Sequence, residues 1–319
     1  MSIRNASFLM LIVFLFISSA SCGKSERNAA PAAGHKISVV ASLFPLYDFA
    51  KHVGKDKVDV EMLLPPSVEP HSFEPKPSDV VRLNKADIFI FTNKYMEPWV
   101  ADIIKGMDNR NTLILDSSRG IDFIEEREEG HKDADQEHER GHAGMDPHIW
   151  LDFGNAVRMV DNICEGFTLK DPANAAYYRK NADEYKADLK ALDARFRQGL
   201  GNCKNRVFIN GGHFAFGYLA ARYGLTYMSA YGFSPDAEPT PAQLVKISMM
   251  LKGHNLKYIF YEELISPRVA GMISRETGAQ MLFLHGAHNV GKGEFNKGVT
   301  FVQLMEKNLE NLEKGLSCH

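Results

Sequence analysis

Two blocks of alternating strand-like and helix-like segments constrain the fold of this chain more than any other feature. Each strand-like run is short, rich in β-branched and aromatic residues, and followed by a segment with helical periodicity. This alternation predicts an α/β fold in which each block forms a mainly parallel sheet flanked by helices. The strand-like runs are residues 36–44, 57–64, 87–93, 111–116, 205–211, 225–232, 257–263 and 280–284, and the main helix-like segments are residues 45–54, 78–86, 97–107, 152–167, 213–224, 240–253, 266–278 and 298–316.

A long helical stretch, residues 173–199, separates the two blocks. A helix of about 26 residues spans nearly 40 Å, which suits a rod that joins two lobes. We therefore predict an N-terminal lobe over residues 37–172, a linking helix over 173–199 and a C-terminal lobe over 200–319. The apolar stripe that predicts the helix consists of Tyr178, Ala182, Tyr185, Leu189, Leu192 and Phe196.

The first residues have the pattern of an export signal. Arg4 precedes an apolar run from Phe8 to Ile17 that is short for a membrane span, and small residues follow. We expect residues 1–21 to be a signal peptide and residues 22–36 to be a flexible tether. Cys22 stands where a bacterial lipoprotein carries its lipid, although simple cleavage after the small residues fits too. The mature chain is then expected in the periplasm or on the outer face of a bacterial membrane.

The composition excludes some partners and leaves the cysteine pairing open. The 319 residues carry a net charge of −3, so neither a basic field for nucleic acid nor a strongly acidic field is present. Outside the cytoplasm, Cys164, Cys203 and Cys318 allow one disulfide and one free thiol. Their spacing contains no CxxC pair, which argues against a cysteine metal site.

An acidic, histidine-rich stretch interrupts the first block from Glu125 to His142. It contains eight acidic and three basic residues, together with His131, His138 and His142. Without apolar periodicity it cannot pack into a core, so we expect a mobile loop. The loop is either an accessory segment that recruits metal ions weakly or a tolerated solvated insertion.

Three histidines follow strand-like runs, where ligands bind in α/β proteins. His71 and His213 come after strands of the first and second block, and His285 comes after the last strand. Ligands bind beyond the carboxyl ends of strands, so these side chains can converge in a metal cleft between the lobes. His148, in "DPHIW", is a candidate for a fourth ligand of a tetrahedral zinc ion. Their separations of 77, 65 and 72 residues form no local motif, and a single loop histidine is often only solvent-exposed.

Two carboxylates flank His148. Asp146 and Asp152 are candidates to accept the N–H of a ligand imidazole. Each is equally a candidate for the acidic residue at the start of a helix.

The chain resembles the zinc/manganese-type solute-binding proteins of bacterial ABC importers, closest to the zinc-binding branch, over residues 37–315. The resemblance implies that His71, His148 and His213 bind the metal. It rests on motifs in the family's order: "FPLYDFAKHVGKDKVDV", "PPSVEPHSFEPKPSD", "EPWV", "MDPHIWLD", "GGHFAFGYLAARYGL", "GFSPDAEPTPAQL" and "GVTFVQLMEKNLENL".

The resemblance leaves the fourth ligand open between several residues. Manganese-type members have Asp at that place, whereas this chain has "FLHGAHN", in which His285 aligns best and His288 is the alternative. A water molecule, Glu74 or Glu262 are further alternatives. An imidazole in place of a carboxylate removes a hard oxygen donor, which favours Zn²⁺ over Mn²⁺.

The resemblance implies a transport function without catalysis. We expect a monomer that captures Zn²⁺ and delivers it to the membrane permease and ATPase subunits of an ABC importer, touching the membrane only through an N-terminal lipid anchor. The alternatives are a Mn²⁺-preferring binding protein of the same class and a secreted zinc hydrolase. A hydrolase needs an open coordination position and a general base, so a closed site argues for transport.

Overall fold

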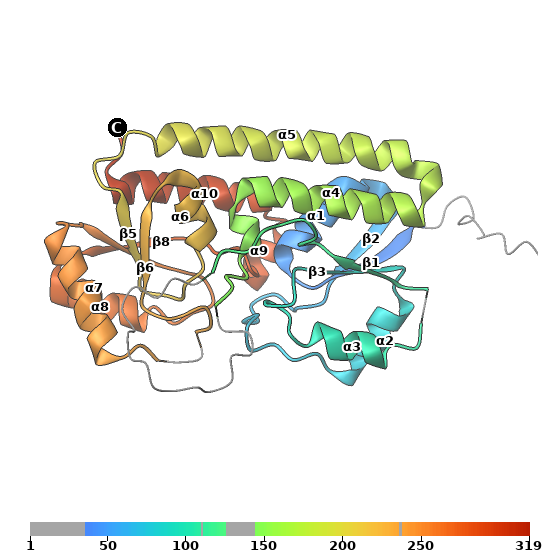
Figure 1. Cartoon of the computed structure of the whole chain (residues 1–319), viewed down its shortest axis with the longest axis horizontal. Helices are drawn as coiled ribbons and strands as arrows, with labels where there is room; N and C mark the ends of the chain where they lie inside the picture. Colours follow the sequence, from blue (N-terminus) through green and yellow to red (C-terminus); the bar gives the residue numbers. More distant parts are fainter. Residues whose placement is uncertain (1–35, 110, 126–143, 236–237) are drawn as a thin grey trace, which may run out of the picture. The chain divides into compact units, whose positions relative to one another are not determined.

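The computed structural model contains two four-stranded parallel sheets, one before and one after a long helix in the sequence, and this helix runs along both of them (Figure 1). It describes residues 36–109, 111–125, 144–235 and 238–319. The strand order is β2-β1-β3-β4 before the long helix and β6-β5-β7-β8 after it, with neighbouring strands parallel in both sheets. The predicted fold class is confirmed. The two halves share one strand order, although no sequence repeat relates them.

The N-terminal lobe is the part of the chain that precedes the long helix. Pro77 begins α2 and cannot donate a backbone N–H, which suits the first position of a helix. The elements are β1 (Ile37–Ala41), α1 (Phe44–Gly54), β2 (Val58–Met62), α2 (Pro77–Lys85), β3 (Ile88–Phe91), α3 (Val100–Gly106), β4 (Leu113–Asp116), the 3₁₀ turn η2 (Ile149–Leu151) and α4 (Phe153–Lys170).

The long helix α5 (Ala175–Gly199) leads into the C-terminal lobe. The helix predicted over residues 213–224 begins only at Gly217, because residues 211–216 form a loop beyond β5. The elements are β5 (Val207–Asn210), α6 (Gly217–Tyr223), β6 (Thr226–Ser229), α7 (Pro241–Gly253), β7 (Tyr258–Tyr261), α8 (Arg268–Thr277), β8 (Gln280–Phe283), the unpredicted α9 (Lys292–Asn296) and α10 (Phe301–Leu316).

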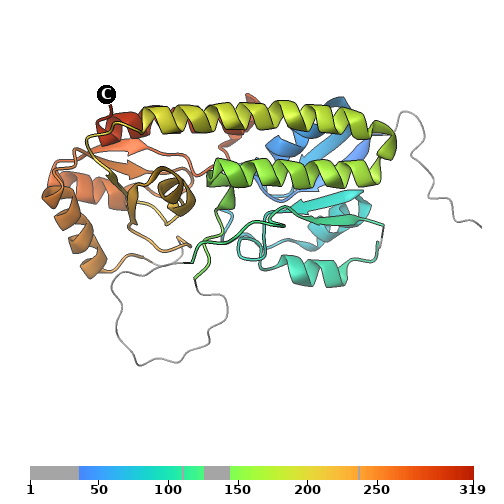
Figure 2. The same cartoon turned by 45° about the horizontal axis from the view of Figure 1, so that its top comes forward.

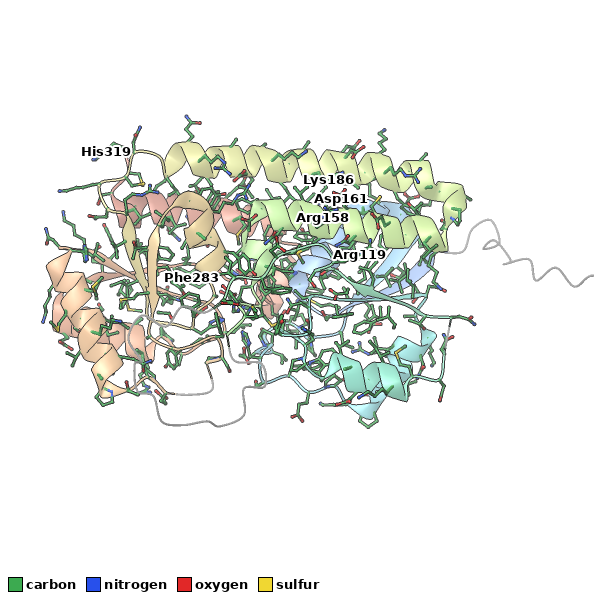
Figure 3. All side chains as sticks on the ribbon, in the orientation of Figure 1. Arg119, Arg158, Asp161, Lys186, Phe283 and His319 are labelled. Carbon is green, nitrogen blue, oxygen red and sulfur yellow. A yellow bond between two sulfur atoms is a disulfide. The ribbon has the colours of Figure 1, made fainter. Side chains whose placement is uncertain are left out.

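Helix α5 packs against both lobes, as its length predicts. It lies beside α4 and contacts α1 of the N-terminal lobe and α10 of the C-terminal lobe (Figure 2). The predicted apolar stripe is buried along its length. On the outer side, Lys186 of α5 forms a 2.7 Å ion pair with Asp161 of α4, and Figure 3 labels both residues on these adjacent helices.

A buried carboxylate joins three of these helices. Asp48 of α1 accepts a 2.7 Å hydrogen bond from the Tyr185 hydroxyl of α5 and a 3.3 Å hydrogen bond from the backbone N–H of Phe301 at the start of α10. Burial raises the pKa of Asp48, although its hydrogen bonds and His52 oppose that shift. The contact ties the two lobes together on the side of α5.

Alternation along the strands divides the apolar side chains between two layers in each lobe. In β1, Val39 belongs to the large core beneath α1, α4, α5 and α10, while Val40 faces the smaller core under α2 and α3. In β5, Phe208 belongs to the large core, whereas Ile209 packs under α7 and α8. The large core is continuous between the lobes.

Several predictions concern residues outside those described. The signal peptide, Cys22, most of the tether, and His131, His138 and His142 are among them. The proposed lobe boundaries stay predictions. Among the described residues, no helix is long and apolar enough to cross a bilayer.

The structure assigns the cysteine pairing. Cys203 is disulfide-bonded to Cys318, and Cys164 is a free, buried thiol. The bond fastens the end of α10 to the segment that follows α5. It closes a loop between positions 115 residues apart, and a long closed loop reduces the entropy of the unfolded chain.

We expect the Cys203→Ser/Cys318→Ser variant to lose roughly 2–5 kcal/mol of unfolding free energy, because the unfolded chain regains that entropy. Urea unfolding followed by circular dichroism measures the difference. A reductant should lower the stability of the wild-type chain to that of the variant and leave the variant unchanged. Equal stability of the oxidised wild type and the variant would contradict the prediction.

Candidate metal centre

Four histidines from distant parts of the chain meet at one point. They are His71, His148, His213 and His288, and one ring nitrogen of each lies within 4.8 Å of the others. All four follow the carboxyl end of a strand, namely β2, β4, β5 and β8 in that order. His148, His213 and His288 are buried, and His71 is partly exposed.

The spacing of the Nε2 atoms matches the ligand shell of one small cation. Nε2 of His148 lies 3.3 Å from that of His71 and 3.2 Å from that of His213, which lies 3.1 Å from Nε2 of His288. Ligand nitrogens about 2.0–2.1 Å from a tetrahedral zinc ion are roughly 3.3 Å apart, by the geometry of the tetrahedron. These three Nε2–Nε2 distances therefore fit the ligand shell of one tetrahedral metal ion.

In three of these imidazoles a carboxylate lies beside Nδ1, the ring nitrogen that points away from the cluster. Nδ1 of His148 lies 2.7 Å from Asp146 Oδ1, which also accepts the backbone N–H of His148 at 2.9 Å. Nδ1 of His213 lies 2.8 Å from Glu262 Oε2, and the other oxygen of Glu262 accepts the backbone N–H of His213. A carboxylate beside Nδ1 favours the tautomer whose Nε2 lone pair is free for a metal.

The third carboxylate is Glu263, which adjoins Glu262 just beyond the end of β7. Its Oε1 lies 3.3 Å from Nδ1 of His288, and its Oε2 accepts a 2.8 Å hydrogen bond from the backbone N–H of Gly286. Two neighbouring residues thus orient the two imidazoles of the C-terminal lobe. His71 differs, because Glu69 accepts its backbone N–H at 3.0 Å rather than a ring nitrogen.

The surroundings set different pKa values within the cluster. Loss of hydration, followed by the charge of neighbouring imidazoles, lowers the pKa of His71 and His148 well below the usual range. Burial also lowers the pKa of His288. Burial opposes ionisation of His213 too, but the carboxylate of Glu262 outweighs it and raises the pKa of His213. Neutral imidazole, which a metal ion requires, is therefore favoured at three positions.

Close packing leaves no room for larger residues at two glycines. A Cβ at Gly212 would lie 1.7 Å from Glu262 Oε1, and a Cβ at Gly286 would lie 2.4 Å from Cε1 of the His288 ring. Trp150 covers the site from the N-terminal lobe. Its ring makes edge contacts with His148 and His288, and its Nε1–H donates a 2.8 Å hydrogen bond to the carbonyl of Gly286.

The structure does not bring every predicted residue into the cluster. His288, the alternative fourth ligand, belongs to it, whereas His285 does not. The ring of His285 instead lies between carboxylates, with Nδ1 3.2 Å from Glu263 Oε1 and Nε2 3.9 Å from Glu294 Oε2. Burial opposes ionisation of His285, but these carboxylates outweigh it and raise the pKa of His285 to about 9. Glu74 is exposed and outside the cluster.

The two carboxylates that flank His148 have different contacts. Asp146 contacts Nδ1 of the His148 imidazole. Asp152 instead caps α4 by accepting the N–H groups of Gly154 and Asn155, and it pairs with Arg222 at 2.8 Å. Two further residues at the site, Trp150 and Glu263, are not among the predicted site residues. For Glu263 a signal was available, because "YEE" lies at the carboxyl end of a strand.

Comparison with known proteins identifies the family. Residues 39–315 match the family described as zinc-uptake complex component A, periplasmic. The chain belongs to this family. It is 40% identical over 314 residues to the high-affinity zinc uptake system protein ZnuA of Bacillus subtilis, with 98% of each chain covered. It is also 32% identical over 279 residues to the zinc-binding lipoprotein AdcA of Streptococcus pneumoniae, spanning 88% of this chain but only 56% of AdcA.

Solved structures of ZnuA-like proteins share the fold. The metal-dependent lipoprotein YcdH of Bacillus subtilis superposes with a TM-score of 0.75 at 38% identity, covering 88% of this chain and 99% of that one. The Zn(II)-bound ZnuA-like domain of Streptococcus pneumoniae AdcA gives a TM-score of 0.74 at 30% identity with the same coverages. The resemblance drawn from the motifs is therefore confirmed.

The lowered pKa of His148 predicts how acid affects the metal-free protein. Below about pH 6.5 this histidine is protonated in the unfolded chain but stays neutral in the folded chain. The free energy of unfolding therefore decreases as the pH is lowered. We expect the wild-type chain to lose about 1 kcal/mol more unfolding free energy than His148→Gln between pH 7.5 and 5.5. Urea unfolding at both pH values, with a chelator present, measures this. Equal losses in the two proteins would contradict the prediction.

Proposed function

We propose that this chain is an extracytoplasmic solute-binding protein that captures Zn²⁺ with His71, His148, His213 and His288 and delivers it to an ABC importer. The observation that carries the proposal is the convergence of these four imidazoles, in which three Nε2–Nε2 distances are 3.1–3.3 Å. Nitrogen lone pairs that face one another at this distance repel, and a bound cation removes that repulsion. Membership in a zinc-uptake family supports zinc as that cation.

The ligand chemistry favours zinc over manganese. Mn²⁺ prefers carboxylate, carbonyl and water oxygens, whereas imidazole nitrogen suits Zn²⁺. The carboxylates Asp146, Glu262 and Glu263 each approach the Nδ1 atom of an imidazole. They orient the rings from the side opposite Nε2 and do not themselves supply oxygen ligands. A four-nitrogen shell would leave manganese without the oxygen donors it prefers.

A closed coordination shell also supports transport over hydrolysis. Catalytic zinc normally has three protein ligands and a water molecule in the fourth position. With His288 as the fourth ligand no position remains for that water. We therefore propose that the chain is a carrier and not an enzyme, in line with the family's description as an uptake component.

The family's description as periplasmic supports a location outside the cytoplasm. We propose that residues 1–21 direct export, that Cys22 carries a lipid anchor, and that the partners are the permease and ATPase subunits of the importer. The protein would act as a monomer, since every proposed ligand comes from one chain.

An accessory role is proposed for the acidic stretch with His131, His138 and His142. Its first residue, Glu125, forms an antiparallel bridge with Met145, which lies three residues before His148. Asp146, the next residue, donates its backbone N–H to the carbonyl of Ile124 at 2.9 Å and holds His148 through its carboxylate. The stretch ends six residues before His148, so we propose that weakly bound zinc passes from it to the four histidines.

A chelator-competition titration with Zn²⁺ and Mn²⁺ tests the site. We expect one tightly bound zinc ion, much weaker manganese, and a loss of about a hundredfold or more in zinc affinity for His288→Ala, because a ligand is removed. His285→Ala should lose no more than about tenfold, since its imidazole is not a ligand. His254→Ala, at an exposed position of the C-terminal lobe, is the control. A larger loss for His285→Ala than for His288→Ala would overturn the ligand assignment.

Growth of the host under zinc limitation tests delivery. Deleting the gene should stop growth in chelator-treated medium, because the importer then lacks its zinc donor, and added zinc but not manganese should restore it. The wild-type gene should complement the deletion, whereas a His71→Ala/His148→Ala gene should not. Normal growth of the deletion strain in a host without a second zinc-uptake system would argue against the proposed function.

A further inference from the structure

The segment 286–292 belongs to the C-terminal lobe by sequence but is bonded largely to the N-terminal lobe. The carbonyl of Gly286 accepts from Trp150 Nε1, and the carbonyl of His288 accepts from the backbone N–H of Phe44 at 3.2 Å. Further along, the carbonyl of Val290 accepts from the N–H of Ser67 at 2.9 Å. We call segment 286–292 the latch segment, since it carries His288 and crosses from one lobe to the other.

Asn289 makes two further contacts with the N-terminal lobe. Its side chain is fully buried, and its Nδ2 donates to the carbonyl of Pro65 at 2.7 Å and to that of Val68 at 2.9 Å. Its Oδ1 accepts the backbone N–H of Val290 at 2.9 Å. Every hydrogen-bonding atom of this amide group is therefore engaged, apart from a second lone pair on the oxygen.

These bonds connect the two loops that carry ligands. Pro65 and Val68 lie in the loop that leads to His71, six and three residues before it, while Asn289 directly follows His288. At the edge of the same contact, the N–H of Lys292 donates to Ser67 Oγ at 3.0 Å. The buried amide of Asn289 thus joins the loop that carries His71 in one lobe to the segment that carries His288 in the other.

We propose that Asn289 is a positioning residue for metal binding, which locks His288 of one lobe against the His71 loop of the other and so slows release of the ion. The inference rests on the proposed function, because it takes both histidines as ligands. Two features indicate that the contacts with the N-terminal lobe hold the latch segment in place, and that its own backbone preference does not. Ala287 has a left-handed backbone with φ of 58°, which disfavours a side chain, and Gly286 has no room for one. Without the contacts of Asn289, the turn is free to relax and withdraw His288.

The test compares Asn289→Ala with the wild-type chain in two measurements. Zinc release into excess chelator, followed by stopped-flow absorbance, should be about tenfold faster or more, since two hydrogen bonds between the lobes are lost. The visible absorption of the Co²⁺-loaded chain should shift from strong tetrahedral bands toward the weaker bands of higher coordination, as water replaces His288. The His288→Ala chain supplies the reference spectrum for that change.

Asn162→Ala is the matched control, because Asn162 is also buried and its Nδ2 donates to two carbonyls, those of Ser117 and Arg119, within the N-terminal lobe. It should lose similar stability yet retain the wild-type spectrum and release rate. Ser67→Ala is a second test in case Asn289→Ala does not fold. Ser67 is exposed, so its substitution should leave the fold intact. It removes one bond of the same contact and should speed release about threefold.

Three outcomes overturn the inference. In the first, Asn289→Ala and Ser67→Ala release zinc at the wild-type rate with the wild-type Co²⁺ spectrum, which leaves the proposed function intact. In the second, Asn162→Ala changes the spectrum and rate as much as Asn289→Ala does, so the effect is general destabilisation. In the third, the wild-type chain binds neither Zn²⁺ nor Co²⁺, and the proposed function fails as well.

Discussion

Four imidazole nitrogens aimed at one point are the constraint on which the rest of the structure depends. At separations of 3.1–3.3 Å their lone pairs repel, and without a cation the arrangement must be held by the surrounding protein. Buried carboxylates do much of this by holding the far side of the rings of His148, His213 and His288. A buried carboxylate is itself costly unless hydrogen-bonded. Asp146, Glu262 and Glu263 each meet that condition by accepting a backbone N–H near the histidine they orient.

The two-lobed fold brings these groups together from distant parts of the sequence. The loops beyond the carboxyl ends of β2, β4, β5 and β8 each contribute one histidine to the cluster, so sheets of both lobes contribute to one site. Helix α5 and the Asp48 contact hold the lobes on one side, and the disulfide anchors the end of α10. Beside the four histidines, the latch segment connects the loops that carry His71 and His288. Local movement of this segment would therefore open the site without a large rotation of the lobes.

Much of this architecture could be predicted because its signals are local. Short apolar runs with helical segments between them predict the sheets, and the stripe on α5 predicts the rod between lobes. Membership of His71, His148 and His213 in the cluster follows from their positions beyond strands together with the family motifs. The choice between His285 and His288 could not be made in this way. Both follow β8 within a few residues, and the turn at Gly286 and Ala287 decides which ring reaches the cluster.

Other features depend on contacts between residues far apart in sequence. The bonds from Asn289 to Pro65 and Val68 cross more than two hundred residues, and no periodicity or motif indicates them. No sequence pattern indicates the hydrogen bond from Trp150 to the carbonyl of Gly286 either. The spacing of three cysteines likewise leaves the pairing of Cys203 with Cys318 open. Such contacts follow from the three-dimensional arrangement of the lobes, which sequence patterns do not supply.

X-ray absorption spectroscopy of the zinc-loaded chain tests the central claim most directly, because it counts the atoms around the metal and recognises imidazole rings by their outer scattering. The account predicts four nitrogen ligands at about 2.0–2.1 Å, all from imidazole. The His288→Ala chain should show three imidazoles, and the His285→Ala chain should still show four. Three imidazoles with an oxygen ligand in the wild-type chain would contradict a closed four-histidine site.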